Sequence, residues 1–386
     1  WWVIIIRKLF NSRNDIKFYK KNKLQLNMRK KILFTAGGTG GHILPTVSLV
    51  NFFDKNYDIV LVSDSRAKKY FKLNKKIKIY IINTDTPYKK NITQILGAYF
   101  KIFISLFKSI FIFIKERPNL VFGLGGYVSF PVSVVSKIFS CPLVLYENNA
   151  SIGRANLKLL LISKKIFVAT ENILNCPSKH LNKIKHTGNI LREEIYKFDN
   201  KKTNEMGDKL SILVIGGSQG AEIFGEVIPN AIKVLNDKGI LKNIHQQCIK
   251  NQKIVLENFY NENNINNSIF EFDNNIFEKI ISSDLVITRS GASTLGELMH
   301  LNKPFITIPF SHAMDNHQME NARYYFERGF CWIINQQNFN KETLLSLINK
   351  IYSNREDHLS KVKKMKTTKK TMPFHIIQTE FDKLIK

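Results

Sequence analysis

Three short apolar runs in this sequence lead directly into a pair of glycines, and a fourth run ends in Arg-Ser-Gly. Stretches long enough for helices lie between them, for example residues 46–55 and 226–238. Short apolar strands that alternate with helices are typical of parallel sheets built from βαβ units. The sequence therefore predicts an α/β fold. The four runs are KKILFTAGGTGGH (30–42), NLVFGLGGYVSFP (119–131), KLSILVIGGSQGA (209–221) and DLVITRSGAST (284–294).

Length and repetition together predict two domains. The chain has 386 residues, whereas an ordinary domain has ~100–200. The first and third glycine turns each open a half with the same order of strand, turn and helix, which indicates two Rossmann-like domains in tandem. We expect a first domain over 28–190 and a second over 191–371, with the boundary in the polar stretch 186–211. The last segment, 372–386, is predicted to form an amphipathic helix that could pack on either domain.

The first 27 residues do not resemble the rest of the chain. WWVIII has no basic residues before it and is too short for the apolar core of a signal peptide, and a basic, asparagine-rich stretch follows. Met28 then precedes the first strand. We expect residues 1–27 to be a non-native or disordered extension; the alternative is a short basic membrane tether.

The charge of the chain favours anionic partners. Lysine and arginine number 58 against 31 acidic residues, which gives a formal net charge of +27. Nucleic acid, an anionic membrane surface and a phosphorylated ligand all fit this charge, and part of the excess reflects a general abundance of Lys, Asn, Ile and Phe. No nucleic-acid-binding motif accompanies the charge, so we expect no nucleic-acid partner.

Neither a metal site nor a disulfide is predicted. The cysteines at 141, 176, 248 and 331 lack metal-finger or redox spacing, which indicates free thiols in a reducing compartment. The sequence has no D-x-D, no H-E-x-x-H and no pair of histidines at i, i+4.

The glycine turns are suited to phosphate binding. Glycine lets the backbone approach a ligand closely, and the free N–H groups at a helix start attract an anion. The turns are not standard nucleotide motifs, because GGTGGH lacks the lysine of a P-loop and does not fit G-x-G-x-x-G, and GGSQGA has Ser218 in place of the middle glycine. ATPase and NAD-dependent dehydrogenase activities are therefore disfavoured.

Several side chains near the turns could carry chemistry. His42 follows the first turn, where Pro45 fits the first turn of a helix, and its imidazole could act as a general base, although packing or capping is the commoner role of a lone histidine. Ser293 and Thr294 can hold an anion at a helix start, and Glu297 suits paired ribose hydroxyls. Arg192 is a candidate cation for a pyrophosphate.

The stretch 95–115 is rich in Ile, Leu and Phe and carries a narrow polar stripe of Lys101, Ser105, Lys108 and Lys115. On an insertion scale, the favourable free energy of its apolar residues and the unfavourable free energy of its lysines nearly cancel. Insertion energy therefore does not decide whether this stretch spans a membrane. Its position between strands of one sheet favours a helix packed on that sheet, with an apolar and basic margin resting on an anionic bilayer. We expect Phe107, Phe111 and Ile112 to belong to this margin. An ordinary buried helix is the alternative.

Seven motifs in order resemble those of the MurG family of UDP-N-acetylglucosamine transferases, from residue 30 to the C-terminus. The resemblance implies a GT-B fold, with two Rossmann-like domains facing across a cleft and the last helix, 372–386, packing back on the first domain. It also implies an inverting, metal-independent transfer of GlcNAc from UDP-GlcNAc to the C4 hydroxyl of the muramyl sugar of lipid I, giving lipid II for peptidoglycan synthesis, without a cofactor. The motifs are GGTGGH, GLGGYVSFP, YENNASIGRANLKLL, TGNILR, GGSQGA, RSGASTLGEL and PFSHAMDNHQMENA.

The resemblance also implies roles for individual residues. Those of the first domain would hold the acceptor, the donor sugar and the base: Thr39, Gly40, Gly41, His42 as the general base, the pyrophosphate loop of Gly125 and Gly126, and Asn149. Those of the second would hold the UDP moiety and the sugar: Arg192, Ser218, the backbone near Asp273, Ala292, Ser293, Thr294, Leu295, Gly296, Glu297 and Gln318. The sequence departs from the family at Tyr146 (His), Ile152 (Pro) and Glu222 (Arg), which puts loop rigidity in question rather than activity.

The family places the protein at the cytoplasmic face of the bacterial inner membrane as a peripheral protein, with roles in cell wall biogenesis, cell shape and cell division. The predicted partners are UDP-GlcNAc, lipid I and, through 95–115, the anionic membrane surface. Two alternatives remain: a UDP-GlcNAc 2-epimerase, which would need no membrane surface, and a non-catalytic nucleotide-sugar-binding protein, which would not need His42 and Asn149.

Overall fold

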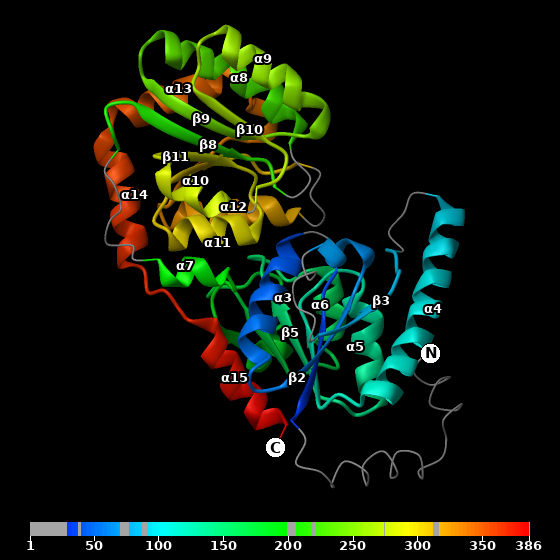
Figure 1. The fold of residues 1–386 in the computed structure, drawn as a ribbon. Helices are drawn as coiled ribbons and strands as arrows, with labels where there is room; N and C mark the ends of the chain where they lie inside the picture. Colours follow the sequence, from blue (N-terminus) through cyan, green and yellow to red (C-terminus); the bar gives the residue numbers. More distant parts are fainter. Residues whose placement is uncertain are drawn as a thin grey trace, which may run out of the picture. The chain divides into compact units, whose positions relative to one another are not determined.

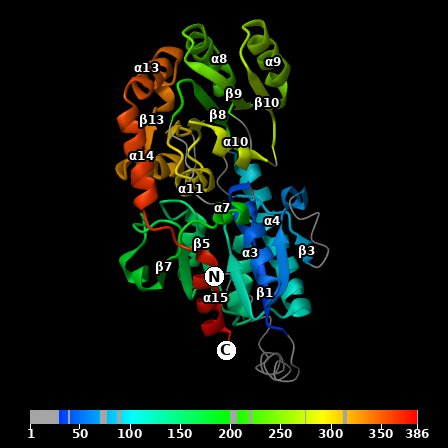
Figure 2. The same cartoon turned by 60° about the vertical axis from the view of Figure 1, so that its left-hand side comes forward.

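The computed structural model describes residues 29–37, 40–69, 77–86, 91–198, 206–217, 221–273, 275–311 and 316–385. They form two compact units, each built around one parallel sheet (Figures 1 and 2), which confirms the predicted α/β fold. The first unit contains the described residues up to Asn148, then Ile152–Ile190 and the segment from Met372 onward; the second contains Asn149–Ser151 and Leu191–Thr371. The predicted extension, 1–27, lies outside the described residues.

The sheet of the first unit has seven parallel strands in the order β3-β2-β1-β4-β5-β6-β7. Most of these strands are short apolar runs buried on both faces, as expected for a parallel sheet covered by helices. The strand order changes direction between β1 and β4, which pair directly. The strands are β1 (Lys31–Thr35), β2 (Asp58–Ser63), β3 (Lys78–Ile81), β4 (Leu120–Gly123), β5 (Leu143–Glu147), β6 (Lys165–Val168) and β7 (Ile184–His186).

Helices cover both faces of this sheet, and the last helix of the chain belongs to it (Figure 1). The buried ring of Phe381 contacts the rings of Phe53, Phe122 and Phe167, so the C-terminal helix packs on the sheet of the first unit. The helices are α3 (Gly40–Phe53), α4 (Ile92–Glu116), α5 (Ser129–Ile138), α6 (Arg154–Leu159) and α15 (Pro373–Leu384), with 3-10 turns η1 (Ser65–Lys69) and η2 (Ser178–Lys183).

The second unit repeats this plan with six parallel strands in the order β10-β9-β8-β11-β12-β13, and its order changes direction between β8 and β11. Its strands are β8 (Leu210–Ile215), β9 (Leu241–Gln247), β10 (Asn267–Phe270), β11 (Leu285–Thr288), β12 (Phe305–Thr307) and β13 (Cys331–Ile333). Its helices are α7 (Glu193–Lys197), α8 (Glu222–Asp237), α9 (Lys253–Glu262), α10 (Ile276–Ser282), α11 (Ala292–His300), α12 (His317–Glu327), α13 (Lys341–Ser353) and α14 (Arg355–Thr367), with 3-10 turns η4 (Lys250–Gln252) and η6 (Gln336–Asn338).

Two helices begin earlier than the sequence predicted. Helix α3 begins at Gly40 rather than at residue 46, because the glycine pair itself adopts helical backbone, so Pro45 lies inside the helix and not in its first turn. Helix α8 begins at Glu222 rather than at 226. Both helices therefore start directly after their glycine turns, which brings their free N–H groups to the ends of β1 and β8.

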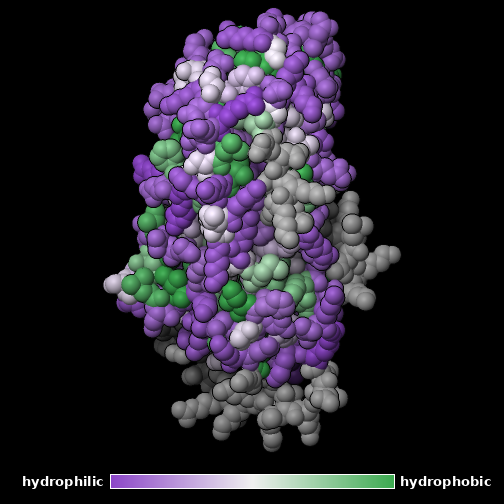
Figure 3. All heavy atoms as spheres, turned by 90° about the vertical axis from the view of Figure 1, so that its left-hand side faces the viewer, coloured by the Kyte–Doolittle hydropathy of each residue, from purple (hydrophilic) through white to green (hydrophobic). Residues whose placement is uncertain are grey.

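Helix α4 turns its apolar face outward. Its buried face includes Ser105 and Ser109, whose hydroxyls donate to the carbonyl oxygens of Lys101 and Ser105 one turn earlier. The face of the molecule drawn in Figure 3 is mainly hydrophilic with small apolar groups. By contrast, nine large apolar side chains of α4 are exposed: Ile92, Leu96, Tyr99, Phe100, Phe103, Ile104, Phe107, Phe111 and Ile114.

Within the described part of the chain, α4 is the one helix long and apolar enough to cross a membrane. In its most apolar 18-residue window, 22% of the residues are buried. The exposed lysines of the predicted polar stripe, Lys101, Lys108 and Lys115, lie on the same helix, whereas Ser105 of that stripe is buried. The alternative of an ordinary buried helix is therefore wrong.

Glu116 anchors the C-terminal end of α4 to the sheet. Its carboxylate accepts hydrogen bonds from Lys31 of β1 (2.9 Å) and Tyr80 of β3 (2.7 Å), and Lys78 lies 3.3 Å away, while the Glu116 side chain is 1% exposed. Burial alone would raise the pKa of Glu116, but the Tyr80 hydrogen bond and the two lysines outweigh it and lower the pKa to about 2. Three chain segments thus meet at one carboxylate.

We predict that Glu116→Ala lowers the free energy of unfolding by about 3 kcal/mol, because it leaves Lys31 and Tyr80 without their shared acceptor. Urea denaturation followed by circular dichroism measures this. Asp237→Asn, which removes the exposed i,i+4 pair with Lys233, is the control and should cost less than about 0.5 kcal/mol. Because the folded-state pKa of Glu116 lies below its ordinary 4.5, its stabilisation should be present above that pH and be lost as the pH falls toward 2. Equal losses in the two variants would contradict an anchoring role.

Candidate active site

In the first unit, two glycine loops interlock where the strand order changes direction, which is where open α/β sheets bind ligands. The Gly37 N–H, after β1, donates to the carbonyl oxygen of Gly125, after β4 (3.2 Å). Gly125 and Gly126 have φ angles of +101° and +79°, which favour glycine. A Cβ atom on Gly126 would also lie 2.2 Å from the Gly37 carbonyl oxygen, so only glycine fits there.

His42 lies against this loop. A Cβ atom on Gly125 would be 2.7 Å from Cε1 and 2.8 Å from Nδ1 of the imidazole, so the ring packs directly on the backbone of Gly125. The Ser129 hydroxyl fixes the other side of the loop by donating to the carbonyl oxygens of Gly125 (2.7 Å) and Thr35 (2.9 Å). The structure thus brings His42, Gly125 and Gly126 together, next to Gly40 and Gly41 at the start of α3; Thr39 lies outside the described residues.

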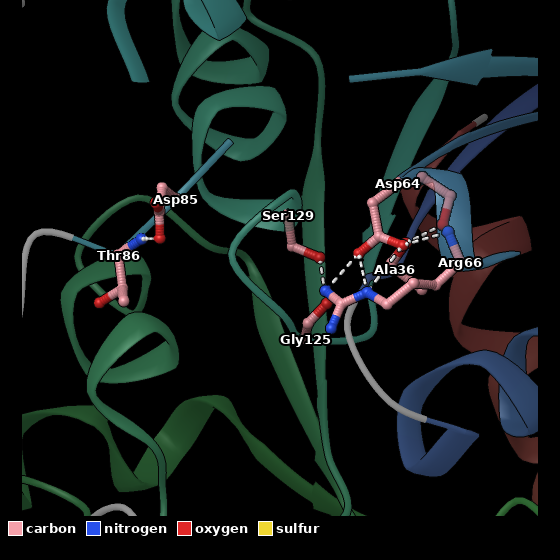
Figure 4. Close-up of polar contacts among 8 residues, drawn as sticks. Ala36, Asp64, Arg66, Asp85, Thr86, Gly125 and Ser129 are labelled. Atoms are coloured by element: carbon pink, nitrogen blue, oxygen red, sulfur yellow. Dashed lines mark hydrogen bonds and ion pairs between the residues drawn. The ribbon is translucent and has the colours of Figure 1, made fainter. Parts of the chain in front are cut away.

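An ion pair after β2 was not found by the sequence analysis. Arg66 approaches the Asp64 carboxylate through Nη2 (2.7 Å) and Nε (3.2 and 3.3 Å). Figure 4 shows this pair together with Ala36, Gly125 and Ser129, at the carboxyl ends of β1, β2 and β4. The available signal was the position of Arg66 just after an apolar strand, although η1 carries other basic residues as well.

In the second unit, the corresponding change of strand order lies between the turn after β8 and the Arg-Ser-Gly turn after β11. Gly217 has a φ angle of +85°, and the Gly216 N–H donates to the side-chain oxygen of Gln247 (3.1 Å). Ser218, predicted to contact the pyrophosphate, lies outside the described residues. Helix α11 begins at Ala292, directly after Gly291, so its N-terminal N–H groups face this edge of the sheet.

Helix α11 presents few of its predicted contact side chains to solvent. Ser293 and Thr294 are partly exposed in its first turn. Leu295 and Gly296 are buried, and the Leu295 side chain belongs to the hydrophobic core. The hydroxyls of Ser293 and Thr294 and the backbone of the first turn are therefore the groups available to an anion.

Arg192 and Glu297, predicted as separate ligand contacts, form a two-point ion pair. Arg192 Nε lies 3.0 Å from Oε1 and Nη2 lies 3.1 Å from Oε2 of Glu297, and Nη1 lies 3.0 Å from Glu194. Burial raises the pKa of Glu297, and the Arg192 ion pair opposes this. The guanidinium group and the carboxylate on α11 therefore hold each other in place, and both groups remain at the same edge of the sheet.

Arg289 is a buried cation that the sequence analysis did not single out. It follows β11, is 9% exposed, and donates to the Ile308 carbonyl oxygen (3.1 Å) and Gln336 Oε1 (2.8 Å). Burial lowers its pKa to about 10, and within the described ranges no carboxylate pairs with it. A buried positive charge that is not neutralised favours an anionic ligand beside it.

Asn149 is held beside the Arg-Ser-Gly turn by Asn321, another residue that the sequence analysis missed. Asn321 Nδ2 donates to Asn149 Oδ1 (3.1 Å) and to the Ser290 carbonyl oxygen (3.0 Å), and its Oδ1 accepts the Ala150 N–H (2.8 Å). The sequence signal was the position of Asn321 three residues after Gln318 on the same helix, one turn apart.

Gln318 and Asp273 use their side chains to support loops. Gln318 Oε1 accepts the N–H groups of Ser290 (3.3 Å) and Phe310 (3.0 Å), and its Nε2 donates to none of the described residues. Asp273 accepts the Asn275 N–H (2.7 Å) and pairs with Lys279 (2.5 Å), which lowers its pKa. The backbone near Asp273 thus remains the group that could contact a base, as the family resemblance implies.

We predict that Gly126→Ala destabilises the first unit by several kcal/mol, because the new Cβ atom meets the Gly37 carbonyl oxygen at 2.2 Å and the φ angle is +79°. Gly97→Ala on α4 is the matched control: no heavy atom lies within 4 Å of its Cβ position, and helix propensity favours alanine by about 1 kcal/mol. Thermal unfolding of both variants measures the difference. A Gly126→Ala variant as stable as the wild type would contradict the interlocked loops.

The two halves of the chain match two descriptions of one family. Residues 32–168 match the glycosyltransferase family 28 N-terminal domain, and residues 211–375 match the glycosyltransferase family 28 C-terminal domain. A protein of Pelagibacter ubique (strain HTCC1062) is 38% identical over 343 residues, which cover 88% of this chain and 94% of the relative. A protein of Rickettsia bellii (strain RML369-C) is 33% identical over 330 residues, 84% of this chain and 91% of the relative.

Both relatives carry the name UDP-N-acetylglucosamine--N-acetylmuramyl-(pentapeptide) pyrophosphoryl-undecaprenol N-acetylglucosamine transferase. Among solved structures, MurG of Acinetobacter baumannii superposes with a TM-score of 0.75 at 23% identity, covering 92% of this chain and 99% of that one, which shows a shared fold. The resemblance drawn from the motifs is confirmed, and the chain belongs to glycosyltransferase family 28.

Proposed function

We propose that this protein transfers N-acetylglucosamine from UDP-GlcNAc to the C4 hydroxyl of the muramyl sugar of lipid I, forming lipid II for peptidoglycan synthesis. The observation that carries this proposal is the 38% identity to the Pelagibacter relative over 94% of its length, since the relative is named for this transfer. The arrangement of side chains at the two sheet edges supports it, as follows.

The second unit is suited to the donor nucleotide. UDP is released as a diphosphate, so catalysis needs groups that stabilise the negative charge of the leaving group. The N-terminus of α11, the buried guanidinium of Arg289 and the hydroxyls of Ser293 and Thr294 would provide them. Glu297, oriented by Arg192, would accept hydrogen bonds from the ribose hydroxyls.

The remaining predicted contacts fit the sugar. Asn149, held by Asn321, and the Nε2 group of Gln318 would bind hydroxyls of GlcNAc. The Gln318 amide contacts Ser290 of the Arg-Ser-Gly turn directly, and Asn321 links Asn149 to the Ser290 carbonyl oxygen. The backbone near Asp273 would contact the uracil, since the Asp273 side chain is already engaged by Lys279.

The first unit is suited to the acceptor and the base. His42 lies on the Gly125 backbone at the edge of the sheet, where it would take the proton of the attacking C4 hydroxyl. The hydroxyl oxygen would then attack the anomeric carbon while the bond to UDP breaks, which inverts the configuration. Gly125 and Gly126 would leave room for the acceptor pyrophosphate.

The transfer itself is tested by incubating the full chain with UDP-GlcNAc labelled in the sugar and a lipid I analogue. We expect a labelled product with a β-1,4 linkage, stoichiometric release of UDP, and unchanged rates with EDTA, because the family resemblance implies a metal-independent reaction. Formation of an epimerised sugar without acceptor would instead indicate the 2-epimerase activity.

We predict that His42→Ala lowers kcat by at least about 100-fold, the usual effect of losing a general base, while the affinity for UDP changes by less than about threefold. His375→Ala, which alters an exposed histidine on α15, is the control and should retain full activity. Unchanged turnover in His42→Ala would remove this residue from the mechanism.

We further propose that the protein binds the cytoplasmic face of the inner membrane through the outward face of α4. Its exposed aromatic and aliphatic side chains and the lysines 101, 108 and 115 combine apolar burial with attraction to anionic lipids. Phe107 and Phe111 are exposed and belong to this face. Ile112, which the sequence placed there too, is 4% exposed and belongs to the core of the first unit, so it is not part of the membrane-binding face.

We predict that replacing Phe107 and Phe111 together by serine weakens binding to vesicles containing anionic phospholipid by at least about tenfold, because two buried aromatic side chains are lost. The matched control replaces Ile254 and Val255, exposed on α9 of the second unit, by serine and should leave vesicle binding unchanged. Cosedimentation measures both. Equal binding of the Phe107/Phe111 variant and the wild type would refute the role of α4.

A further inference from the structure

We infer that Arg66 binds a phosphate of the pyrophosphate that links the acceptor sugar to its lipid. The inference rests on the proposed function and names a residue that neither the motifs nor the family resemblance identified. Arg66 is the third residue after β2, so it lies at the same edge of the sheet as the loops after β1 and β4.

The position of Arg66 is one where Rossmann-like sheets discriminate between ligands. In such sheets the phosphate lies at the first glycine turn, and a side chain near the end of the second strand contacts the adjoining ligand group. Here the second strand is followed by Asp64 and Arg66. The Asp64 Oδ2 atom lies 3.1 Å from the Cβ position of Gly37, and the Arg66 Nη2 atom lies 2.7 Å from Oδ2. The Asp64 carboxylate therefore lies between the guanidinium group and the interlocked loops and contacts both.

Asp64 holds the guanidinium group in a fixed orientation. Its buried carboxylate accepts the backbone N–H of Arg66 (2.9 Å) as well as the Nε and Nη2 contacts. The Arg66 side chain remains 58% exposed, and its Nη1 group donates to none of the residues that the structure describes. Such an exposed pair adds little stability, but it presents a planar pair of donors to solvent in the geometry that phosphate oxygens match.

The chemistry of the surroundings favours a phosphate of the acceptor. The N-termini of α3 and α5 lie at this edge, and their partial positive charges act in the same direction as Arg66. In the proposed function, the donor diphosphate has its own cation in the second unit, the buried Arg289. The reaction has a second diphosphate, that of the lipid-linked acceptor, and Arg66 of the first unit would bind it. Because Asp64 cancels part of its charge, we expect a moderate contribution rather than an absolute requirement.

The test measures binding of farnesyl pyrophosphate and of farnesol by the full chain without UDP-GlcNAc. These two probes share a prenyl chain and differ in the pyrophosphate. Arg66→Ala should weaken binding of farnesyl pyrophosphate by about tenfold and leave binding of farnesol unchanged. Arg66→Gln, which can still donate to Asp64 and so protects the fold, should show the same selective loss. The matched control is Arg355→Ala, which removes another partly exposed, carboxylate-paired arginine in the second unit.

Kinetics provide the second readout. In the transfer assay, both Arg66 variants should lower kcat/KM for the lipid I analogue by about tenfold and leave KM for UDP-GlcNAc within twofold. If the wild-type protein shows no transfer but both Arg66 variants still lose pyrophosphate binding selectively, the result would support the role of Arg66 and refute the proposed function. Equal affinity of wild type and variants for farnesyl pyrophosphate, or no preference of the wild type for it over farnesol, would overturn the inference for Arg66.

Discussion

A parallel sheet brings the carboxyl ends of all its strands to one edge, and the chemistry of this protein depends on that constraint. In each unit the strand order changes direction beside the first strand, which leaves a space between two loops that no crossover helix covers. The glycines after β1, β4 and β8 and the Arg-Ser-Gly turn after β11 all lie at these two places. Residues far apart in the sequence, such as His42 and Gly125, meet there because the strands before them pair.

The carboxyl edges of the two sheets share a second feature, an ion pair in which a carboxylate fixes the orientation of an arginine. Asp64 holds Arg66 in the first unit, and Glu297 holds Arg192 in the second. A carboxylate next to an anion-binding group lowers the net charge, so it weakens attraction to a phosphate. In return it removes rotational freedom from a long side chain before the ligand arrives. Arg289 is the exception, since it is oriented by a carbonyl and an amide oxygen and keeps its full charge.

The sequence predicted the fold well because its signals are local. The four apolar runs became β1, β4, β8 and β11, the strands that flank the two changes of direction. Helix starts were predicted less well, because Gly40 and Gly41 were expected to form a turn and instead adopt helical backbone. The ion pairs were not foreseeable. Lys31, Lys78 and Glu116 come together only because β1 and β3 flank the end of α4, and no spacing in the sequence encodes that.

The site was predicted in part for the same reason. Motif residues such as His42 and Glu297 were identified by their neighbours in the sequence. Arg66 and Asn321 act through contacts with Asp64 and Asn149, and Arg289 acts through its burial; none of these properties is visible in a single sequence. Ile112 was placed on the wrong face of α4 because apolar residues lie on both faces of this helix, so the sequence does not reveal which side is covered.

The outward face of α4 also sets how the protein behaves in solution. At low ionic strength the formal charge of +27 keeps copies of the chain apart, whatever apolar surface they expose. Added salt screens this repulsion, because the Debye length is only ~10 Å at 0.1 M. Salts of strongly hydrated anions also strengthen apolar association. Under those conditions we expect the nine exposed apolar side chains of α4 to govern contacts between copies of the chain, because charge repulsion no longer keeps them apart.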